Sequence, residues 1–398
     1  MRDLLPQDMR QFRYVEDLFR ERCLQWGYQE IRTPLLEYLH LFTAAGTLTP
    51  DMLNRVYSFL DWDGWSGERV VLRPDSTIPA ARLFITELAQ RPTARLFYVQ
   101  SVLSFEATGT ESRERWQAGV EVMGGRPPQA EVELVALARE MLEALGLKPE
   151  VRLGHMGLLR SLLEEVGVKE EEEVDRLTAQ EGLLWERLRD SRPELGEALS
   201  LARLGGRSPG FLENLGSVLL PHLPGLRPTL EEFSAIAGLL TSVGCPYTVD
   251  LGLGRGFEYY TGVVFQFYCG EVRVGGGGRY DNLIPLLGGK ALPATGFAIY
   301  LDRVMALTAT PTTSLPVQVQ AAEGCWPRAF SLAGELRAQG FAAELATGGP
   351  AGGPGPPGAS VMVEDGPIFV LSGRGRFTSA AELVRALREG GDAEVSPA

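Results

Sequence analysis

Two blocks of strand-like sequence flank a long acidic stretch that has the character of helices. Residues 95–102 and 116–122 are interpreted as strands around a polar turn at residues 107–113, and residues 151–153 form a third strand-like segment. Residues 156–228 are predicted to be helical, and the sheet pattern returns at residues 247–251. Strands interrupted by helices and then resumed favour one mixed α+β domain built on an antiparallel sheet.

A second, smaller domain is predicted after a linker. Residues 308–316 are rich in Thr and Pro, which is typical of a linker. The chain then begins a small α/β unit, but residues 348–358 contain only Gly, Pro and Ala and cannot form a helix. We therefore expect a core of residues 1–310, with a helical insertion at about residues 156–228, and a degenerate α/β domain at residues 317–398.

Composition narrows the classes of function. The formal net charge is −13, whereas proteins that grip a nucleic-acid backbone usually present a basic face. No apolar run has membrane-spanning length, so no membrane contact is expected. The four cysteines form no CxxC pair and the three histidines are not at metal-ligand spacing, which predicts no metal site and a reducing, cytoplasmic setting.

Three segments resemble the signature motifs of the class II aminoacyl-tRNA synthetases. Residues 27–36 resemble motif 1, a helix and strand that end in a proline, here Pro34, at the dimer interface. Residues 97–106 and 116–121 resemble motif 2, two antiparallel strands with their loop, and residues 295–303 resemble motif 3. The resemblance implies an antiparallel sheet flanked by helices and a homodimeric core.

Two further segments resemble the histidyl branch of this family. Residues 255–262 are similar to the histidine-recognition motif of histidyl-tRNA synthetase, and residues 277–281 are similar to its second signature. Two kinds of protein share this pattern: the synthetase, and the regulatory subunit that the short catalytic subunit of ATP phosphoribosyltransferase needs for the first step of histidine biosynthesis. Residues 71–83 resemble the regulatory kind more closely, because Asp75-Ser76-Thr77 stands where synthetases usually have Glu-Gly-Thr.

The resemblance implies a pocket for L-histidine. Such a ligand needs acids for its ammonium, donors for its carboxylate, and groups that pair with its ring nitrogens. By resemblance, the backbone end of the ligand would be surrounded by Asp75, Thr77, Gln117 and Tyr260, the imidazole would meet Glu121 and Tyr259, and the carboxylate side would meet Arg255.

The same residues have structural interpretations. Asp75 or Thr77 could cap a helix that begins near Ile78. Gln117 and Glu121 share one face of a strand, which could be a solvated sheet face. The adjacent Tyr259 and Tyr260 are expected to point to opposite faces, so one of them could be core. We interpret residues 275–278, all glycine, as a tight turn between strands rather than a phosphate-binding loop.

The parts needed for aminoacylation are altered. The motif 2 arginine of the family, which would grip the α-phosphate of ATP, falls on Ser104, whose hydroxyl provides no positive charge. Motif 3 keeps Arg303 but has Tyr300 where a glycine normally lets ATP approach. Glu106 and Arg303 remain as a candidate residual nucleotide site.

The sequence therefore favours a non-catalytic regulatory subunit that binds histidine and a short-form ATP phosphoribosyltransferase. This interpretation assigns no catalytic residue, no cofactor and no tRNA ligand, and it places a homodimer core within a hetero-oligomer. Two alternatives stay open: a divergent histidyl-tRNA synthetase, and a synthetase paralogue that acts as a binding module for another partner. Ser104 and Tyr300 argue against the first alternative, and the identity of the bound protein would decide the second.

Overall fold

The chain divides into two compact units, which meet in sequence between Thr310 and Pro311. The structure is a computed structural model. It describes residues 3–44, 55–62, 67–105, 112–165, 167–168, 183–196, 205–207, 209–253, 259–311, 315–346, 359–366, 369–371 and 374–389.

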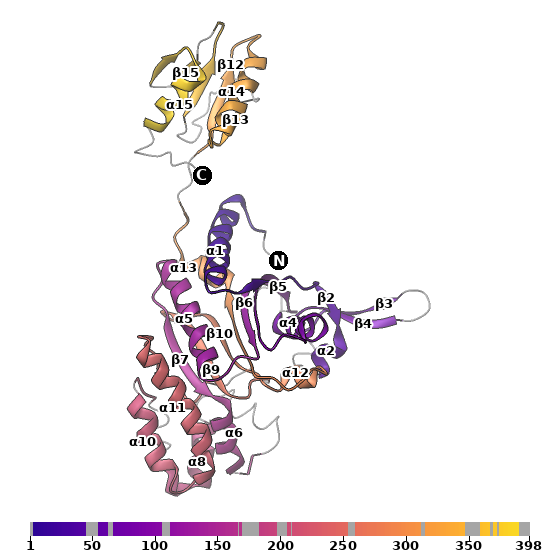
Figure 1. Cartoon of the computed structure of the whole chain (residues 1–398), viewed down its shortest axis with the longest axis vertical. Coiled ribbons are helices and arrows are strands. Elements are labelled where there is room, and N and C mark those ends of the chain that lie inside the picture. The colour runs from indigo at the N-terminus through magenta and orange to yellow at the C-terminus, as the bar shows by residue number, and fades with distance from the viewer. Residues whose placement is uncertain are drawn as a thin grey trace. The chain divides into compact units, whose positions relative to one another are not determined.

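An eight-stranded sheet forms the centre of the first unit (Figure 1). Its six inner strands pair antiparallel, which confirms the predicted α+β class and antiparallel sheet, and only the outermost pairs β1–β5 and β7–β8 are parallel. In spatial order the strands are β1 (Gln29–Glu30), β5 (Ala94–Leu103), β6 (Glu114–Met123), β11 (Ala294–Tyr300), β10 (Val272–Arg279), β9 (Val263–Cys269), β7 (Glu150–His155) and β8 (Thr248–Val249).

The two faces of this sheet have different roles. On one face Phe97 of β5 meets Phe19 of α1 (Pro6–Gln25), with ring centroids 6.0 Å apart. Helices α5 (Gln129–Ala144) and α13 (Leu301–Leu307) pack against α1 and complete this layer. The next residue of β5, Tyr98, turns its side chain to the other face of the sheet. The short helix α4 (Thr77–Leu83) and the π-helical turn η1 (Phe84–Leu88) that follows it lie on this face. The candidate site lies on this second face.

The glycine run was expected to form a turn, and that expectation is wrong. Gly275, Gly276, Gly277 and Gly278 lie inside strand β10, where they pair with β9 and β11. None of the four has a positive φ angle, so a turn conformation does not explain them. A Cβ at Gly277 would stand 2.0 Å from the carbonyl oxygen of Gly296. The run therefore serves close approach between neighbouring strands rather than chain reversal.

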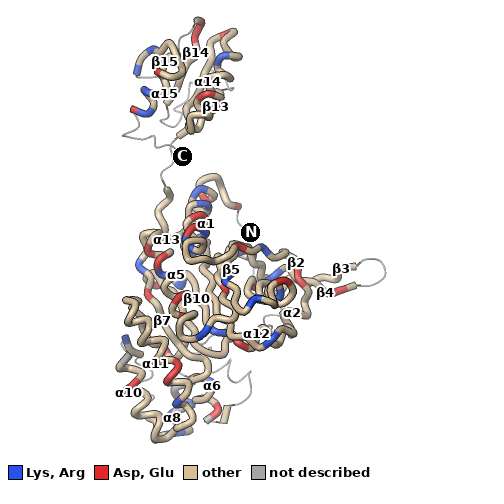
Figure 2. Tube along the Cα trace, in the orientation of Figure 1, with Lys and Arg blue, Asp and Glu red and all other residues tan. Residues whose placement is uncertain are grey.

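The described elements between β7 and β8 are all helical (Figure 1). Leu215, Phe233 and Leu240 are among the side chains that bury this layer against the core of the first unit. Basic and acidic residues are mixed along these helices, as Figure 2 shows. The elements are α6 (Met156–Glu165), α8 (Leu183–Ser191), the 3₁₀ turns η2 (Pro193–Leu195) and η3 (Pro224–Leu226), α10 (Pro209–Leu219) and α11 (Arg227–Ser242).

A separate three-stranded sheet projects from the first unit (Figure 1). Its order is β2 (Leu36–Tyr38), β4 (Gly67–Leu72) and β3 (Ser58–Trp62), and all three strands pair antiparallel. Helix α2 (Leu39–Ala44) follows β2, and the short helix α12 (Leu283–Leu286) packs against α4.

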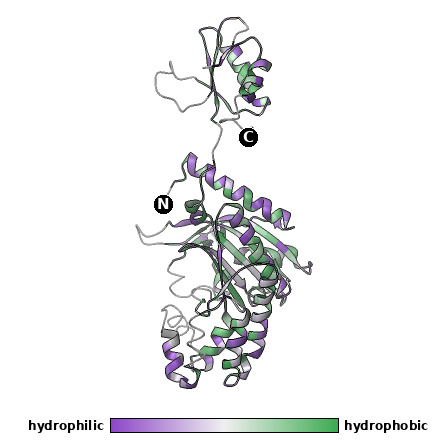
Figure 3. Ribbon diagram, turned by 90° about the vertical axis from the view of Figure 1, so that its left-hand side faces the viewer, coloured by the Kyte–Doolittle hydropathy of each residue, from purple (hydrophilic) through white to green (hydrophobic). Residues whose placement is uncertain are grey.

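The second unit has its own five-stranded sheet and its own hydrophobic core. The predicted all-Gly/Pro/Ala segment, residues 348–358, lies outside the described residues. Hydrophobic residues concentrate in the sheets and on the helix sides that cover them, as Figure 3 shows. None of the described helices is both long and apolar enough to cross a membrane. In chain order the elements are β12 (Val317–Ala321), α14 (Trp326–Ala338), β13 (Ala343–Leu345), β14 (Ser360–Val363), β15 (Phe369–Leu371), β16 (Gly375–Phe377) and α15 (Ala380–Glu389).

Candidate functional site

An inner cavity of about 270 Å³ lies between α4 and the strands β6, β10 and β11. Polar side chains that are far apart in the sequence meet on its wall. Five of the residues predicted for a histidine pocket line it, namely Asp75, Thr77, Gln117, Tyr259 and Tyr260. The structure thus brings these five residues together, and their role as ligand contacts stays a prediction.

Asp75 sits at the start of α4 and has two roles. Its Oδ1 accepts a hydrogen bond of 3.0 Å from the backbone N–H of Ile78 in the first turn of α4, although the N-cap position itself is Ser76 and not Asp75 or Thr77. The same carboxyl also faces the inner cavity. Burial raises its pKa above the ordinary value, and hydrogen bonds from the backbone of residues 76–78 oppose that shift. A cationic ligand group in the cavity would favour the ionised form of this carboxyl.

Gln117 presents an unused acceptor. Its Oε1 is buried and accepts no hydrogen bond from any described residue. The side chain lines the cavity rather than a solvated sheet face, so that structural interpretation does not apply here. A buried acceptor left unpaired costs about 1–3 kcal/mol. A ligand N–H that entered the cavity would remove that cost.

Glu121 lies one layer behind the cavity wall. It is 1% exposed, and the described lining of the cavity does not include it. The hydroxyl of Tyr98 donates to its Oε1 at 2.9 Å, and the hydroxyl of Tyr280 donates to its Oε2. Burial raises the pKa of Glu121 to about 8, although hydrogen bonds from Tyr280, Thr77 and Tyr98 favour the ionised form. The sequence predicted direct contact with an imidazole, whereas this arrangement puts Tyr280 between the carboxyl and the cavity.

Three tyrosines form the aromatic side of the cavity. Tyr259 and Tyr260 have ring centroids 4.7 Å apart, and Tyr280 meets Tyr259 edge-on at 5.8 Å. Both members of the adjacent pair line the cavity, so neither is only core. Gly278 allows this packing, because a Cβ there would stand 2.9 Å from the Tyr260 ring. Burial raises the pKa of all three hydroxyls, which therefore stay protonated and can donate.

Two residues of the predicted sites lie outside the described residues. These are Arg255, predicted at the carboxylate side of the ligand, and Glu106, predicted in the residual nucleotide site. The roles assigned to both stay predictions.

An outer cavity of about 1200 Å³ shares part of its wall with the inner one. Gln117, Arg115, Arg273 and Tyr300 line both cavities, and Arg303 lines the outer one. These shared residues place the predicted histidine pocket directly beside the altered synthetase motifs.

Tyr300 is held among arginines at this shared wall. The guanidinium carbons of Arg303 and Arg273 lie 5.0 Å and 5.5 Å from the centre of its ring. Arg273 also donates a hydrogen bond of 3.0 Å to the Tyr300 hydroxyl, and Arg303 donates one of 2.9 Å to the Arg273 carbonyl oxygen. The tyrosine ring is thus a fixed part of the wall.

Ser104 lines the inner cavity, and its hydroxyl is already hydrogen-bonded to a neighbouring side chain. Its hydroxyl oxygen accepts a hydrogen bond of 2.9 Å from Nη2 of Arg115. The guanidinium near this position therefore comes from the neighbouring strand β6.

Sequence reasoning missed Tyr98, Tyr280, Arg115 and Arg273. Tyr280 belongs to the second signature segment, so its position was indicated but not its contact with Glu121. Tyr98 likewise lies in the motif 2 segment, whereas Arg115 and Arg273 lie outside the quoted motifs, and the roles of all three depend on cross-strand neighbours. Among the described residues, no group of three or more His, Cys, Asp or Glu side chains could hold a metal ion.

Comparison with known proteins agrees with this architecture. The histidyl-tRNA synthetase family profile matches residues 1–304. The ATP phosphoribosyltransferase regulatory subunit of Dehalococcoides mccartyi strain CBDB1 is 49% identical over 308 residues, which cover 76% of this chain and 75% of that protein. The histidine–tRNA ligase of Methanosarcina acetivorans is 34% identical over 350 residues, 84% of this chain and 81% of that one.

A solved structure gives the same result. An ATP phosphoribosyltransferase regulatory subunit/histidyl-tRNA synthetase from Bacillus halodurans superposes with a TM-score of 0.74 at 29% identity, covering 87% of this chain and 90% of that one. The identity to a regulatory subunit exceeds that to the ligase from Methanosarcina, 49% against 34%. The chain therefore belongs to the histidyl-tRNA synthetase family and, within it, to the ATP phosphoribosyltransferase regulatory subunits.

Proposed function

We propose that this chain is a non-catalytic subunit that binds L-histidine in the inner cavity and regulates a short-form ATP phosphoribosyltransferase, the enzyme of the first step of histidine biosynthesis. The observation that carries the proposal is the unpaired acceptor of Gln117 beside the Asp75 carboxyl, in a cavity of small-molecule size. These two groups suit a ligand ammonium, which has three donors and a positive charge.

Recognition of the ammonium would use the α4 end of the cavity. Asp75 would supply the charge, Gln117 the neutral acceptor, and the Thr77 hydroxyl a further acceptor. Tyr260 lines the same space and would close it on the aromatic side. Arg255 would meet the ligand carboxylate, as the family resemblance predicts.

Glu121 would recognise the imidazole in one of two ways, either through the Tyr280 hydroxyl or after the imidazole has displaced that hydroxyl. An imidazole beside Tyr259 could hydrogen-bond to the Tyr280 hydroxyl, or displace that hydroxyl and donate its own N–H to the carboxyl. Either arrangement makes Glu121 the final acceptor. An imidazole that displaced the Tyr280 hydroxyl would give Oε2 of Glu121 a new donor, whereas an apolar side chain in the same place would leave that oxygen unpaired.

Chemistry on ATP is not expected from the outer cavity. Phosphoryl chemistry needs charge aimed at the α-phosphate, and Ser104 offers none. Tyr300, fixed between Arg273 and Arg303, stands where the family normally has a glycine. Arg303, with Glu106, stays only as a proposed residual nucleotide site. We assign no tRNA ligand to the chain.

Assembly is proposed at two levels. Two copies would form a homodimer core through the segment around Pro34 and the helix α1 before it, and this core would join the catalytic subunits in a hetero-oligomer. We place this complex in the cytoplasm, in keeping with the biosynthetic role and with four buried cysteines that are all free.

The test is a reconstituted assay of the short-form transferase with and without this chain, titrated with histidine. Transferase activity should depend on the chain, and histidine should inhibit the mixture. The Glu121→Gln variant should blunt inhibition while leaving assembly intact, and Glu213→Gln, at an exposed acid of α10, is the matched control. A transferase that is equally active and equally sensitive to histidine without the chain would refute the regulatory role.

The synthetase alternative has its own readout. Charging of tRNA by this chain alone at ordinary synthetase rates would replace the regulatory proposal with that alternative. Copurification of a different protein, with no effect on the transferase, would favour the third interpretation, a binding module for another partner.

A further inference from the structure

Gln100 is a buried amide in the strand beside the inner cavity. It lies in β5, is 2% exposed, and does not belong to the described lining of the cavity. In the antiparallel pairing of β5 with β6 it stands directly opposite Gln117, which does line the cavity. Directly opposite residues have Cβ atoms about 4.5–5.5 Å apart, so the two long side chains can bring their amides together.

Three donors fix the orientation of the Gln100 amide. Its Oε1 accepts a hydrogen bond of 3.2 Å from the backbone N–H of Thr33 and one of 2.9 Å from the Thr33 hydroxyl. The guanidinium of Arg73 donates to the same oxygen. A reversed amide would set its NH₂ group against these donors, so the nitrogen must point away from them. Gln100 is therefore a donor that is held in one direction.

The donor of Gln100 and the acceptor of Gln117 are both unused. Nε2 of Gln100 and Oε1 of Gln117 are buried, and neither atom is hydrogen-bonded to a described residue. Buried polar groups in native proteins normally have a partner, and one left without a partner is unfavourable. A single hydrogen bond between the two amides would satisfy both atoms.

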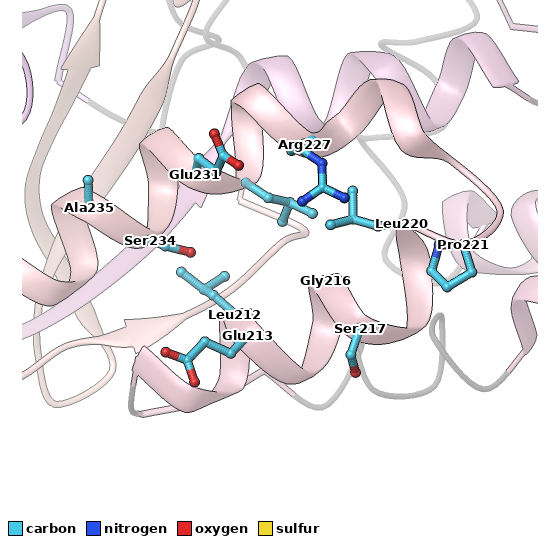
Figure 4. Close-up of a pocket in the computed structure, with 11 residues that line it drawn as sticks. Leu212, Glu213, Gly216, Ser217, Leu220, Pro221, Arg227, Glu231, Ser234 and Ala235 are labelled. Carbon is cyan, nitrogen blue, oxygen red and sulfur yellow. The ribbon is translucent and has the colours of Figure 1, made fainter.

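A larger groove of the first unit lacks this feature. It has a volume of about 820 Å³ and lies between α10 and α11, where Figure 4 shows Glu213, Ser217, Arg227 and Glu231 on its walls. These four residues are exposed, so water can satisfy their polar atoms. No described residue that lines this groove has a buried side-chain atom without a hydrogen-bond partner. The pair of unused amide atoms therefore points to the inner cavity.

We propose that Gln100 is a positioning residue for the ammonium group of histidine. It donates to Oε1 of Gln117 and so keeps the oxygen of that amide, rather than its NH₂ group, turned toward the ammonium. An amide oxygen has two lone pairs, so it can accept from Gln100 and from the ligand at once. Without this donor the Gln117 amide can reverse and present only N–H groups to a cation. The inference rests on the proposed function and names the residue that makes its ammonium contact selective.

The test is a double-mutant cycle on the full chain, with the affinity for L-histidine measured by calorimetry. Gln100→Glu keeps acceptor oxygens for Thr33 and Arg73 but has no NH₂ group, so circular dichroism should show a folded protein. Gln117→Met removes the amide that Gln100 is proposed to orient.

Gln11→Glu is the matched control. The amide nitrogen of Gln11 also donates inside the fold, to the carbonyl oxygens of Met305 and Thr308 at 2.6 Å each. Gln11 lies in α1, which covers the opposite face of the sheet from the inner cavity. The control variant should therefore lose stability without losing affinity for L-histidine.

Gln100→Glu should cost roughly three- to tenfold more affinity in the parent than in the Gln117→Met background, as expected for one hydrogen bond. An attraction between the new carboxylate and the ligand ammonium is present in both backgrounds, so it cancels from the comparison. A purely structural effect of Gln100→Glu would also be the same in both. Equal effects in the two backgrounds would overturn the inference.

A second comparison does not depend on the folding of Gln100→Glu. Gln117→Glu presents an oxygen acceptor in every orientation, so it should bind L-histidine at least about tenfold more tightly than Gln117→Met. Equally weak binding by these two variants would mean that residue 117 does not serve as an acceptor, and the inference would fail while histidine binding by the parent stands. A parent that binds no L-histidine, alone or with the transferase, would refute the proposed function itself.

Discussion

The carboxyl of Glu121 occupies the space that a side chain at residue 296 would need. The two residues are cross-strand neighbours in β6 and β11, and a Cβ on Gly296 would stand 1.8 Å from Oε2 of Glu121. This glycine belongs to the segment that resembles motif 3. The Glu121 carboxyl can therefore lie at the back of the inner cavity only because residue 296 has no side chain.

Substitution of Gly296 should abolish histidine binding. In Gly296→Ala the new methyl group would displace the Glu121 carboxyl and disturb its bonds with Tyr98 and Tyr280. Calorimetry should detect no histidine binding to this variant, and its melting temperature should fall. Gly238→Ala in α11 is the control, since a Cβ there meets nothing within 4 Å. It should bind like the parent and be slightly more stable. Normal binding by Gly296→Ala would contradict the assigned position of Glu121.

Removal of the charge at Glu121 should weaken histidine binding without removing the side-chain volume. Burial raises the pKa of Glu121 to about 8 in the ligand-free chain, and an imidazole N–H that donates to the carboxyl would favour its ionised form. Glu121→Gln keeps an acceptor but cannot ionise, and a hydrogen bond to a charged group contributes about 1.5–3 kcal/mol. The expected loss of affinity is roughly ten- to a hundredfold, measured by calorimetry on the chain alone or on the assembled complex. Equal affinity of the parent and the variant in both settings would show that the imidazole is held elsewhere.

The same carboxyl makes the stability of the ligand-free protein depend on pH. Burial raises the pKa of Glu121 to about 8 from the ordinary 4.5, so between these values the folded chain binds more protons at this site than the unfolded chain. Its contribution to the free energy of unfolding therefore falls as pH rises through this window, by at most about 1.4 kcal/mol per pH unit, and levels off above the folded pKa.

The readout is the difference in unfolding free energy between the parent and Glu121→Gln from pH 5.5 to 9. The titratable groups around Glu121 are Asp75, Tyr98, Tyr259, Tyr260 and Tyr280, and all of them remain in the variant. The parent should lose stability relative to the variant up to about pH 8 and not beyond. A constant difference, or one of opposite slope, would contradict the assigned burial effect.

The sequence indicated which residues would come together at the cavity, but not which of them would line it and which would lie behind its wall. Asp75 and Gln117 were grouped because family motifs mark them, and they do share a wall. The position of Glu121 behind Tyr280 depends on the register of β6 against β5 and β11, which a single sequence does not determine. Tyr98 illustrates the same limit: a Cβ on Gly119, its cross-strand neighbour, would stand 2.2 Å from the tyrosine ring.

The glycine run failed as a prediction for a related reason. Residues 275–278 were placed in a tight turn by the family resemblance and by the freedom of glycine to form turns, whereas their role is set by strands that approach from both sides. Tertiary contact overrode local preference. The helix α1, by contrast, agrees with its own apolar spacing, because Val15, Phe19 and Cys23 recur at helical intervals and all three are buried.

Arg73 should be a major contributor to stability. It is 5% exposed, and its guanidinium donates to the carbonyl oxygens of Ser101, Thr33 and Pro34 at 2.7, 2.9 and 3.1 Å. Arg73→Met would leave these buried acceptors without their donor, each at a cost of about 1–3 kcal/mol. Urea denaturation should show a loss of several kcal/mol. Arg91→Met, at an exposed position, should change stability by less than about 0.5 kcal/mol. A similar small change at Arg73 would mean that water replaces its contacts.

Histidine-dependent exchange of pyrophosphate into ATP should be undetectable for the parent and should stay so for Ser104→Arg. The new guanidinium would meet Arg115, whose Nη2 already lies 2.9 Å from the Ser104 oxygen, so two like charges would compete for one place. Tyr300 would also remain fixed between Arg273 and Arg303. Loss of one charged group aimed at a transition state costs about 10²–10³ in rate, and here the surrounding wall has changed as well. Exchange at ordinary synthetase rates by the single variant would show that Ser104 alone had silenced an otherwise intact synthetase site.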